Sequence, residues 1–299
     1  MRIKDTKANK IFMLVLLIII MIVYFDSKYS NNGSSTVEFN YKNDINIESI
    51  SANINIWVDN KYDTAQVVYN SKNNGYLDVE ERNGTTNIKE KVKKKFINFV
   101  FDNETPTLSI YLPSNELNNL RVNSISGDIE AYENLNTKNL ELFSTSGNIN
   151  LLDVNSEKDL SVKTISGEIF LNNGNADVIN ISSTSGAIET YNLDSSNTSL
   201  SSISGEISVN DVTTDKLKIK TTSSDVDLDY AEVKDGIDIS TVSGEIDGIF
   251  KDVEYKYNIE TISGEININE AEFEKKYSTS TGIPFNLKTV SGDLNINTK

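Results

Sequence analysis

Hydrophobic and polar positions repeat in a fixed order along residues 120–299. Each repeat contains six residues in this order: a hydroxyl residue, a variable residue, a serine, a glycine, a usually polar residue and an aliphatic residue. The first copy runs from Ser124 to Ile129. The unit returns eight times, once with Ser224 in the glycine position. Successive glycine positions are 19 or 20 residues apart until the last interval, which is 28. A constant period of this length predicts an array of stacked repeats.

Two aliphatic columns appear when the nine copies are aligned on the glycine position. The first stands five residues before it: Val122, Leu142, Val162, Ile181, Leu200, Ile219, Ile239, Ile259 and Leu287. The second stands two residues after it: Ile129, Ile149, Ile169, Ile188, Ile207, Val226, Ile246, Ile266 and Leu294. Alternation of period two on both sides of a glycine predicts two short strands that meet at a corner, each with one row of side chains inward. We therefore expect an all-β fold, a β-solenoid resembling a parallel β-helix, with about nine coils of 19–20 residues.

Hydroxyl groups occupy two further columns of the repeat. Three residues before the glycine every copy has serine or threonine, and the residue directly before the glycine is always serine. If the alternation continues through the corner, these hydroxyls point inward, where an unpaired hydroxyl is costly. We expect each one to bond to the equivalent oxygen or a backbone carbonyl of a neighbouring coil, about 4.8 Å away. The glycine is expected to allow a close approach of two backbones.

The first 35 residues differ from the repeats. Residues 1–10 form a basic tail, and residues 11–25 are apolar without a break. This order predicts a transmembrane anchor at 11–25, with the tail in the cytoplasm and the rest of the chain outside the cell. Because no small-residue cleavage pattern follows it, we favour a retained single-pass anchor over a cleaved secretory signal, which is the alternative. Residues 26–35 form a polar tether.

Residues 36–119 are rich in strand patterns but less regular than the repeats. Ile45–Glu48 and Ile54–Val58 alternate well, and Ser49–Ile54 between them looks like a degenerate copy of the repeat. An open solenoid end exposes unpaired strand edges, so this segment is expected to be an irregular β cap with the first coils. Its basic patch, Lys89–Lys95, is interpreted either as a solvated hairpin arm or as a contact for anionic envelope polymer or lipid headgroups.

Composition excludes several classes of function. The chain of 299 residues has no cysteine and no histidine, so disulfides, thiolate chemistry, the usual zinc ligand and the usual neutral-pH base are missing. Its formal net charge is −16, and such a surface repels nucleic acid and anionic lipid. The repeated serines would each need a general base to act as nucleophiles, and none is available.

The repeats resemble a known family. Leu108 to Pro113, followed by Leu120 to Ile129 and its copies, is similar to the bacterial putative-adhesin family, a family of unknown function built from Ser-Gly-Asp/Glu-Ile repeats. The resemblance covers about residues 36–297. It implies a β-solenoid held outside the cell, sometimes on an N-terminal membrane anchor and sometimes encoded near envelope-stress regulators of Gram-positive bacteria. It implies no catalytic residues.

An acidic column directly follows the glycine. Seven of its nine members are Asp or Glu, and like charges stacked about 5 Å apart repel one another. One hypothesis is that the acidic column has a binding function, either weak binding of a divalent cation such as Ca²⁺ or docking of a cationic partner. The residues assigned to such a site are Glu206, Asp225, Glu245 and Glu265. The other interpretation is that acidic and amide residues beside glycine are ordinary turn and solubility residues, and no further cofactor is expected.

These patterns favour a non-enzymatic, membrane-anchored extracellular β-solenoid that acts as an adhesin or binds the cell envelope. Its expected partners are the membrane through residues 11–25 and an envelope polymer, a cationic partner or a surface ligand, but no nucleic acid. An accessory or sensor component of an envelope-stress response is one alternative. A polysaccharide-active enzyme is another, because Asp225 and Asp227 form a conceivable carboxylate pair.

The enzyme alternative is disfavoured by symmetry. A glycosidase needs unlike environments for its acid and its partner, whereas these carboxylates occupy equivalent exposed corners. A break in the repeat that makes a cleft would mark an active site. Only the insertion at 270–284 qualifies, and we expect it to be a loop or a terminal covering element.

Overall fold

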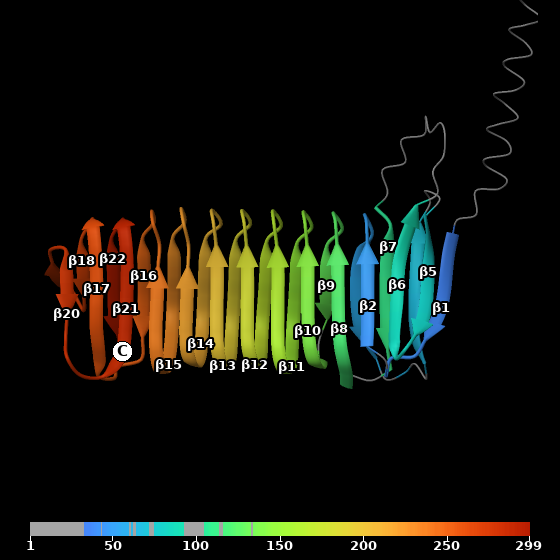
Figure 1. The fold of residues 1–299 in the computed structure, drawn as a ribbon, viewed down its shortest axis with the longest axis horizontal. Coiled ribbons are helices and arrows are strands. Elements are labelled where there is room, and N and C mark those ends of the chain that lie inside the picture. The colour runs from blue at the N-terminus through green and yellow to red at the C-terminus, as the bar shows by residue number, and fades with distance from the viewer. Residues whose placement is uncertain are drawn as a thin grey trace, which may run out of the picture.

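The computed structural model describes residues 33–42, 44–59, 61, 64–71, 75–92, 105–113, 116–132 and 134–299. Every regular element in these ranges is a β-strand, and the strands join in one sheet. Figure 1 shows a straight rod in which strands of successive coils lie side by side in two layers, joined by narrow corners at one edge. The predicted all-β solenoid is therefore confirmed.

The predicted anchor, residues 11–25, lies outside the described residues. In the described part of the chain, no helix has the length and apolar character needed to cross a membrane.

The middle of the rod is built from parallel strands. These are β8 (Glu116–Ser124), β9 (Ile129–Tyr132), β10 (Leu135–Ser144), β11 (Ile149–Thr164), β12 (Ile169–Ser183), β13 (Ile188–Ser202), β14 (Ile207–Lys220) and β15 (Val226–Ser240). Equivalent residues stack in register, as Ile149 on Ile169 and Ile169 on Ile188. Both aliphatic columns are buried to within 1% exposure along the whole rod, so the core is a set of columns rather than a globular centre.

Four coils in the middle of the rod have a second bend that the sequence patterns did not predict. The long strands β11 to β14 contain one residue with left-handed backbone: Asp153, Asn173, Asn192 and Asp211, with φ between 51° and 58°. Asp and Asn adopt this conformation more readily than other side chains because they can bond locally to the backbone. The chain therefore turns at Ser-Gly on one edge and at Asp or Asn further round the coil.

The corner glycines are required by close backbone approach. A Cβ atom on Gly147 would lie 2.1 Å from the Gly127 carbonyl oxygen, and one on Gly167 would lie 2.0 Å from that of Gly147. Neither glycine has a positive φ, so contact rather than left-handed backbone excludes a side chain there. The predicted reason for the glycine is confirmed.

The hydroxyls three residues before the glycine are buried, as predicted, but most of their bonds differ from the prediction. Ser124 Oγ donates to the Gly127 carbonyl of its own corner at 2.7 Å. In two other corners the glycine N–H donates to the hydroxyl of the same corner. Only Thr261, among the described residues, reaches a neighbouring coil, at the Gly292 carbonyl 3.3 Å away. Bonding between coils is therefore wrong as a general rule, because in four corners the hydroxyl bonds within its own corner.

The serine directly before the glycine is exposed in every copy of the repeat. The prediction that it points inward is wrong, because the chain turns at this residue and the alternation of the strand stops. Four of the buried hydroxyls three residues before the glycine have no partner among the described residues: Ser144, Ser183, Thr241 and Thr289.

The N-terminal end of the rod is closed by strands of mixed direction. They are β1 (Gly33–Phe39), β2 (Asp44–Ser49), β3 (Asn53–Val58), β4 (Ala65–Ser71), β5 (Gly75–Arg82), β6 (Thr85–Val92) and β7 (Thr107–Leu112). Strand β2 lies between β8 and β6, and β3 lies between β9 and β7, all parallel. Ala52 takes the glycine position of this coil, because its carbonyl faces Gly127. Strands β5 and β4 then pair antiparallel with β6 and β7 and cover the outermost coil.

The C-terminal end contains an inserted coil. Its strands are β16 (Ile246–Phe250), β17 (Tyr255–Ser263), β18 (Ile266–Ile268), β19 (Ala271–Phe273), β20 (Lys276–Ser278), β21 (Ile283–Ser291) and β22 (Leu294–Thr298). Strand β21 pairs with both β15 and β17, and β22 pairs with both β16 and β18. The ninth repeat therefore lies between the seventh and the eighth, and stacking in strict sequence order is wrong at this end. Strands β19 and β20 pair antiparallel with β18 and β17 and cover the eighth coil, as the covering element predicted at 270–284.

Candidate functional site

A line of exposed β-branched side chains follows the Ser-Gly corners. We call the residues two positions before the glycine the corner edge: in spatial order they are Ile50, Ile125, Thr145, Ile165, Thr184, Ile203, Thr222, Val242, Val290 and Ile262. Its seven aliphatic members are 42–72% exposed. Single exposed apolar residues are ordinary, but a line of them along one edge is a feature of interaction surfaces.

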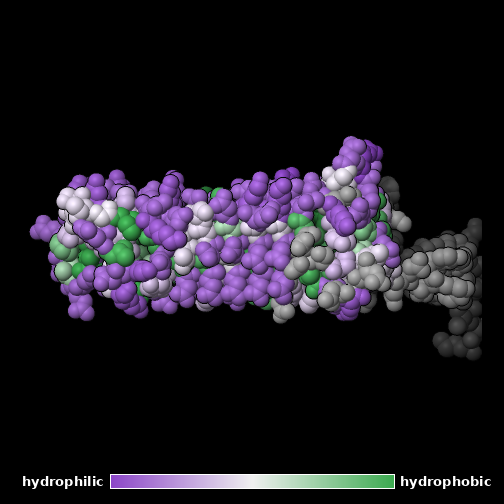
Figure 2. All heavy atoms as spheres, turned by 90° about the horizontal axis from the view of Figure 1, so that it is seen from below, coloured by the Kyte–Doolittle hydropathy of each residue, from purple (hydrophilic) through white to green (hydrophobic). Residues whose placement is uncertain are grey.

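The corner edge is held by the backbone beneath it. Ser146 N–H donates to the Ile125 carbonyl at 3.0 Å, and Ser166 N–H donates to the Thr145 carbonyl at the same distance. Neighbouring corners are thus bonded to one another, so their outward side chains keep a regular spacing of about 4.8 Å. The opposite edge of the rod, seen in Figure 2, is largely hydrophilic over the middle coils, which makes the apolar corner edge distinctive.

The acidic column beside the corner edge has partly a structural role. The Asp128 carboxylate accepts a bond from Asn148 N–H at 2.8 Å, and the Asn148 side-chain oxygen accepts one from Glu168 N–H at 2.9 Å. The short Asp and Asn side chains accept a bond from the backbone amide of the adjacent coil. No described Glu side chain of the column makes this bond. The amide donors offset part of the repulsion expected within the column.

The four residues predicted as a cation site lie on one exposed line, but not as consecutive neighbours. Glu206, Asp225 and Glu245 stand on adjacent coils, while Asp293 of the inserted coil separates Glu245 from Glu265. Asp225 Oδ1 already accepts a bond from Glu245 N–H at 2.8 Å. Within the described ranges, no group of three or more acidic, His or Cys side chains is arranged to hold a metal ion. Calcium binding remains a prediction.

Two carboxylates near this line are shifted toward protonation. Burial raises the pKa of Glu245, with further contributions from Asp247, Asp293 and Asp225, while a bond from Asn295 opposes the shift. Asn295 Nδ2 donates to Glu245 Oε1 and to Asp247 Oδ1, each at 2.7 Å. Burial also raises the pKa of Asp227, followed by the charges of Asp247 and Asp229. Both shifts therefore arise first from burial and then from neighbouring carboxylates.

Sequence reasoning missed a buried carboxylate, Glu90. This side chain of β6 is 3% exposed, and its Oε2 accepts bonds from the amides of Ile50 at 2.6 Å, Ser51 at 2.8 Å and Ala52 at 3.1 Å. The hydroxyls of Ser49, Ser51 and Tyr69 donate to the same carboxylate. In later coils the corner amides bond to carbonyls of the preceding coil. Glu90 thus supplies the acceptors for the first corner of the rod.

The pKa of Glu90 is lowered in spite of its position. Burial alone would raise it, but the amides of Ser51 and Ala52, the Ser49 hydroxyl and the Ile50 amide together favour the carboxylate. In the sequence, Glu90 lies within the basic run Lys89–Lys95. The only sign that its side chain points inward is its alternation with Thr86 and Ile88, which are also buried. Of that basic run, Lys89 pairs with Glu48 at 2.8 Å, and residues 93–95 lie outside the described part.

Comparisons with known proteins agree with the geometry. The model of the family Toastrack DUF4097 matches residues 42–297. A solved structure named a putative lipid binding protein from Parabacteroides distasonis is 16% identical with a TM-score of 0.50, over 90% of this chain and 98% of that one. A putative adhesin from Bacteroides fragilis is 16% identical with a TM-score of 0.46, over 90% and 99%. No curated protein matches the chain.

The Parabacteroides distasonis structure, at 16% identity, bears on the fold alone. The family match is stronger evidence, because it spans the N-terminal cap from β2 onward, all the repeats and nearly all of the inserted last coil. It also agrees with the resemblance carried by the Ser-Gly-Asp/Glu-Ile repeats. The chain therefore belongs to the Toastrack DUF4097 family.

Proposed function

We propose that this protein is a non-enzymatic extracellular rod, held at the membrane by residues 11–25, that binds an adhesion or cell-envelope partner along its corner edge. The observation that carries the proposal is the line of seven exposed aliphatic side chains on one edge. Covering such a line removes apolar surface from water at many points along the rod.

The hydrogen-bonded backbone holds the side chains of the corner edge in position before a partner binds. Because the corners are bonded to one another, a partner loses little free energy in ordering them on binding. The acidic column runs beside the apolar line, so a partner with apolar groups and positive charges fits better than a neutral one.

The contact is tested by crosslinking in the producing cells. A photoreactive amino acid at Ile165, on the corner edge, should capture a partner, whereas the same group at Leu152, on the flat face of β11, should not. Replacing Ile125, Ile165 and Ile203 by threonine should reduce capture by a reporter at Val242. Threonine already stands at this position in Thr145, Thr184 and Thr222, so the fold should be retained. Equal capture from Ile165 and Leu152 would contradict the assignment of the edge.

The location is tested separately. Protease added to intact cells should cut the polar tether at residues 26–35, release the rod and leave a membrane-bound fragment that contains residues 11–25. A chain that is protected until the cells are broken would rule out the extracellular rod.

A further inference from the structure

Three lysines stand side by side on the outer face of β14. Lys216, Lys218 and Lys220 alternate with the buried Leu217 and Ile219, so all three side chains are exposed on the same face. Alternate residues of a strand are about 6.6 Å apart, which spreads the three ammonium groups over about 13 Å.

Two of these three lysines have no acidic residue as a strand partner. Lys216 lies between Asn197 and Gly236, and Lys220 lies between Ser201 and Ser240. Lys218 has Asp238 beside it, yet no ion pair joins any of the three lysines to a described residue.

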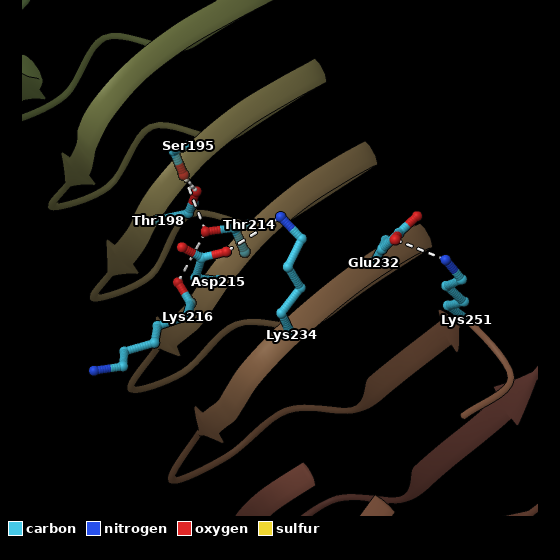
Figure 3. Close-up of polar contacts among 8 residues, drawn as sticks. All are labelled: Ser195, Thr198, Thr214, Asp215, Lys216, Glu232, Lys234 and Lys251. Carbon is cyan, nitrogen blue, oxygen red and sulfur yellow. Dashed lines mark hydrogen bonds and ion pairs between the residues drawn. The ribbon is translucent and has the colours of Figure 1, made fainter. Parts of the chain in front are cut away.

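Nearby lysines of the same rod behave differently. Lys234 pairs with Asp215 at 3.3 Å and Lys251 pairs with Glu232 at 2.7 Å, and in Figure 3 Lys216 extends away from both pairs. The chain has 44 acidic residues against 28 basic ones, so acidic partners are not scarce. Lys138, Lys158 and Lys163 also form no ion pair with a described residue, so the local feature of this face is that three such lysines stand on one strand.

A groove crosses the same face. It has a volume of about 380 Å³ and is lined by residues of β12 to β15 and β21, among them Lys216, Lys218, Asn197 and Asp238. Gly236 leaves it open, because no side chain stands there between Lys216 and Pro284.

Unlike the corner glycines, Gly236 is not required by the backbone. A Cβ atom on it would have ordinary contact, 3.8 Å from the Pro284 carbonyl oxygen, and its φ is not positive. The open groove is thus a feature of the surface that the fold does not demand.

We propose that this groove binds an anionic, polyhydroxylated polymer whose charges are phosphate or carboxylate groups. The lysine ammonium groups would donate to the anionic oxygens, while Asn197, Asn286 and Asp238 offer acceptors for hydroxyl groups. No aromatic side chain lines the groove, so it lacks the stacking platform of a single-strand nucleic-acid site. The site lies on the flat face of the rod and uses none of the corner-edge residues, so either assignment can fail without the other.

The test measures binding by the full chain in neutral detergent. Labelled oligomers of poly(glycerol phosphate), polygalacturonate, neutral dextran and single-stranded DNA are titrated by fluorescence anisotropy. One variant changes Lys216, Lys218 and Lys220 to glutamine, and a second is Gly236→Val, which fills the groove. The control changes Lys138, Lys158 and Lys163, three exposed lysines of β10 and β11, to glutamine and so has the same net charge as the first variant.

Wild type should bind at least one of the two anionic oligomers and not the dextran. The β14 triple variant and Gly236→Val should each bind it about tenfold more weakly, while the control stays within about twofold. Binding of only one oligomer would identify phosphate or carboxylate as the recognised group. The proposal is overturned if wild type binds neither anionic oligomer, if the control loses as much as the β14 variant, or if DNA binds equally well. Thermal unfolding of Gly236→Val at or above the wild-type temperature shows that a loss of binding is not a loss of fold.

Discussion

At the scale of single residues, glycine occurs in two different environments in this rod. A corner glycine stands against a carbonyl oxygen of the next coil, whereas Gly236 faces open space. Residue type alone does not distinguish a corner glycine from Gly236, because both kinds of glycine lie in regular strands or at their ends. The repeat motif identifies the corner glycines in the sequence, and the neighbouring coil shows that Gly236 has room for a side chain.

This difference predicts opposite effects of the same substitution. Gly167→Ala places a methyl group 2.0 Å from the Gly147 carbonyl oxygen and should lower the free energy of unfolding by about 1–3 kcal/mol, because the stacked backbones must separate. Gly236→Ala should be neutral or stabilising by roughly 0.5–1 kcal/mol, since it restricts the unfolded chain without a clash. Chemical denaturation of both variants gives the comparison. Equal losses would show that the corners relax more easily than their geometry implies.

Glu90 makes the N-terminal cap sensitive to acid. Its pKa in the folded protein lies below the ordinary value, so its contribution to stability is present above the ordinary glutamate range. That contribution is lost as the pH falls through the folded pKa, because protonation removes the negative charge that strengthens the bonds from three corner amides. The effect should be local to the first corner.

The single tryptophan reports on this cap. Trp57 belongs to the same coil, in β3, and its ring stacks on Tyr132 at a centroid distance of 3.9 Å. We expect Trp57 fluorescence to change in acid before the far-ultraviolet signal of the whole rod is lost. Glu90→Gln should show the altered fluorescence at neutral pH and lose about 1–3 kcal/mol. The control Glu48→Gln removes only a partly exposed pair with Lys89 and should change stability by less than about 1 kcal/mol.

The repeat columns show how far single residues allowed prediction. Aliphatic residues five before and two after the glycine, and the degenerate copy Ser49–Ile54, were assigned to their places from spacing alone. The outward serines and the hydroxyl bonds within each corner were not, because the alternation of a strand ends where the chain turns. The corner edge was also missed, although a column of Ile, Val and Thr was its signal.

At the scale of elements, the order of strands in space differs from the order in sequence at both ends. The degenerate coil of β2 and β3 lies inside the later strands β6 and β7, and the last coil lies inside the eighth. The spacing between glycines gives the number of residues in a coil but not which other coil it stacks on. The sequence therefore could not show the order of the coils in space. The interval of 28 residues was the one sign of it.

The inserted coil predicts an unusual response to truncation. A chain that stops after residue 282 lacks β21 and β22, so β17 and β18 lose their only contact with β15 and β16 through strand pairing. We expect limited proteolysis to remove residues 251–282 from this chain while the coils before them stay resistant. A chain that stops after Phe250 should resist digestion as a whole. If the longer variant is fully resistant, the eighth coil can pair directly with the seventh and the insertion is dispensable.

At the scale of the whole molecule, the C-terminal end of the rod is covered by two short strands, β19 and β20, which pair with the eighth coil over three residues each and leave only short outer edges. Lys275, between these two strands, also donates to the Gly264 carbonyl at 3.0 Å and so serves the outermost corner. Covered ends prevent strand pairing between molecules. The repulsion expected from a net charge of −16 acts in the same direction.

Removing this cover should make the rod associate end to end. Replacing residues 271–278 by a Gly-Ser linker of the same length leaves the connection to β21 intact but exposes the edges of β17 and β18. Analytical ultracentrifugation should then show association that increases with protein concentration and with salt, since salt weakens the repulsion between acidic rods. A matched variant with Glu270 and Glu272 changed to glutamine keeps the strands and should remain a monomer. A linker variant that stays monomeric at high salt would show that charge alone keeps the rods apart.

The inserted coil also sets the timing of folding. A ribosome makes the chain from its N-terminus, so coils as far as β16 can add to the stack as soon as they are made. Strands β17 and β18 are made next, yet Ile259 cannot take its place until Leu287 has arrived to lie between it and Ile239. Residues 283–299 therefore supply the two strands that join the eighth coil to the seventh, and a nascent chain that has not reached them leaves the eighth coil unpaired with the rest of the stack.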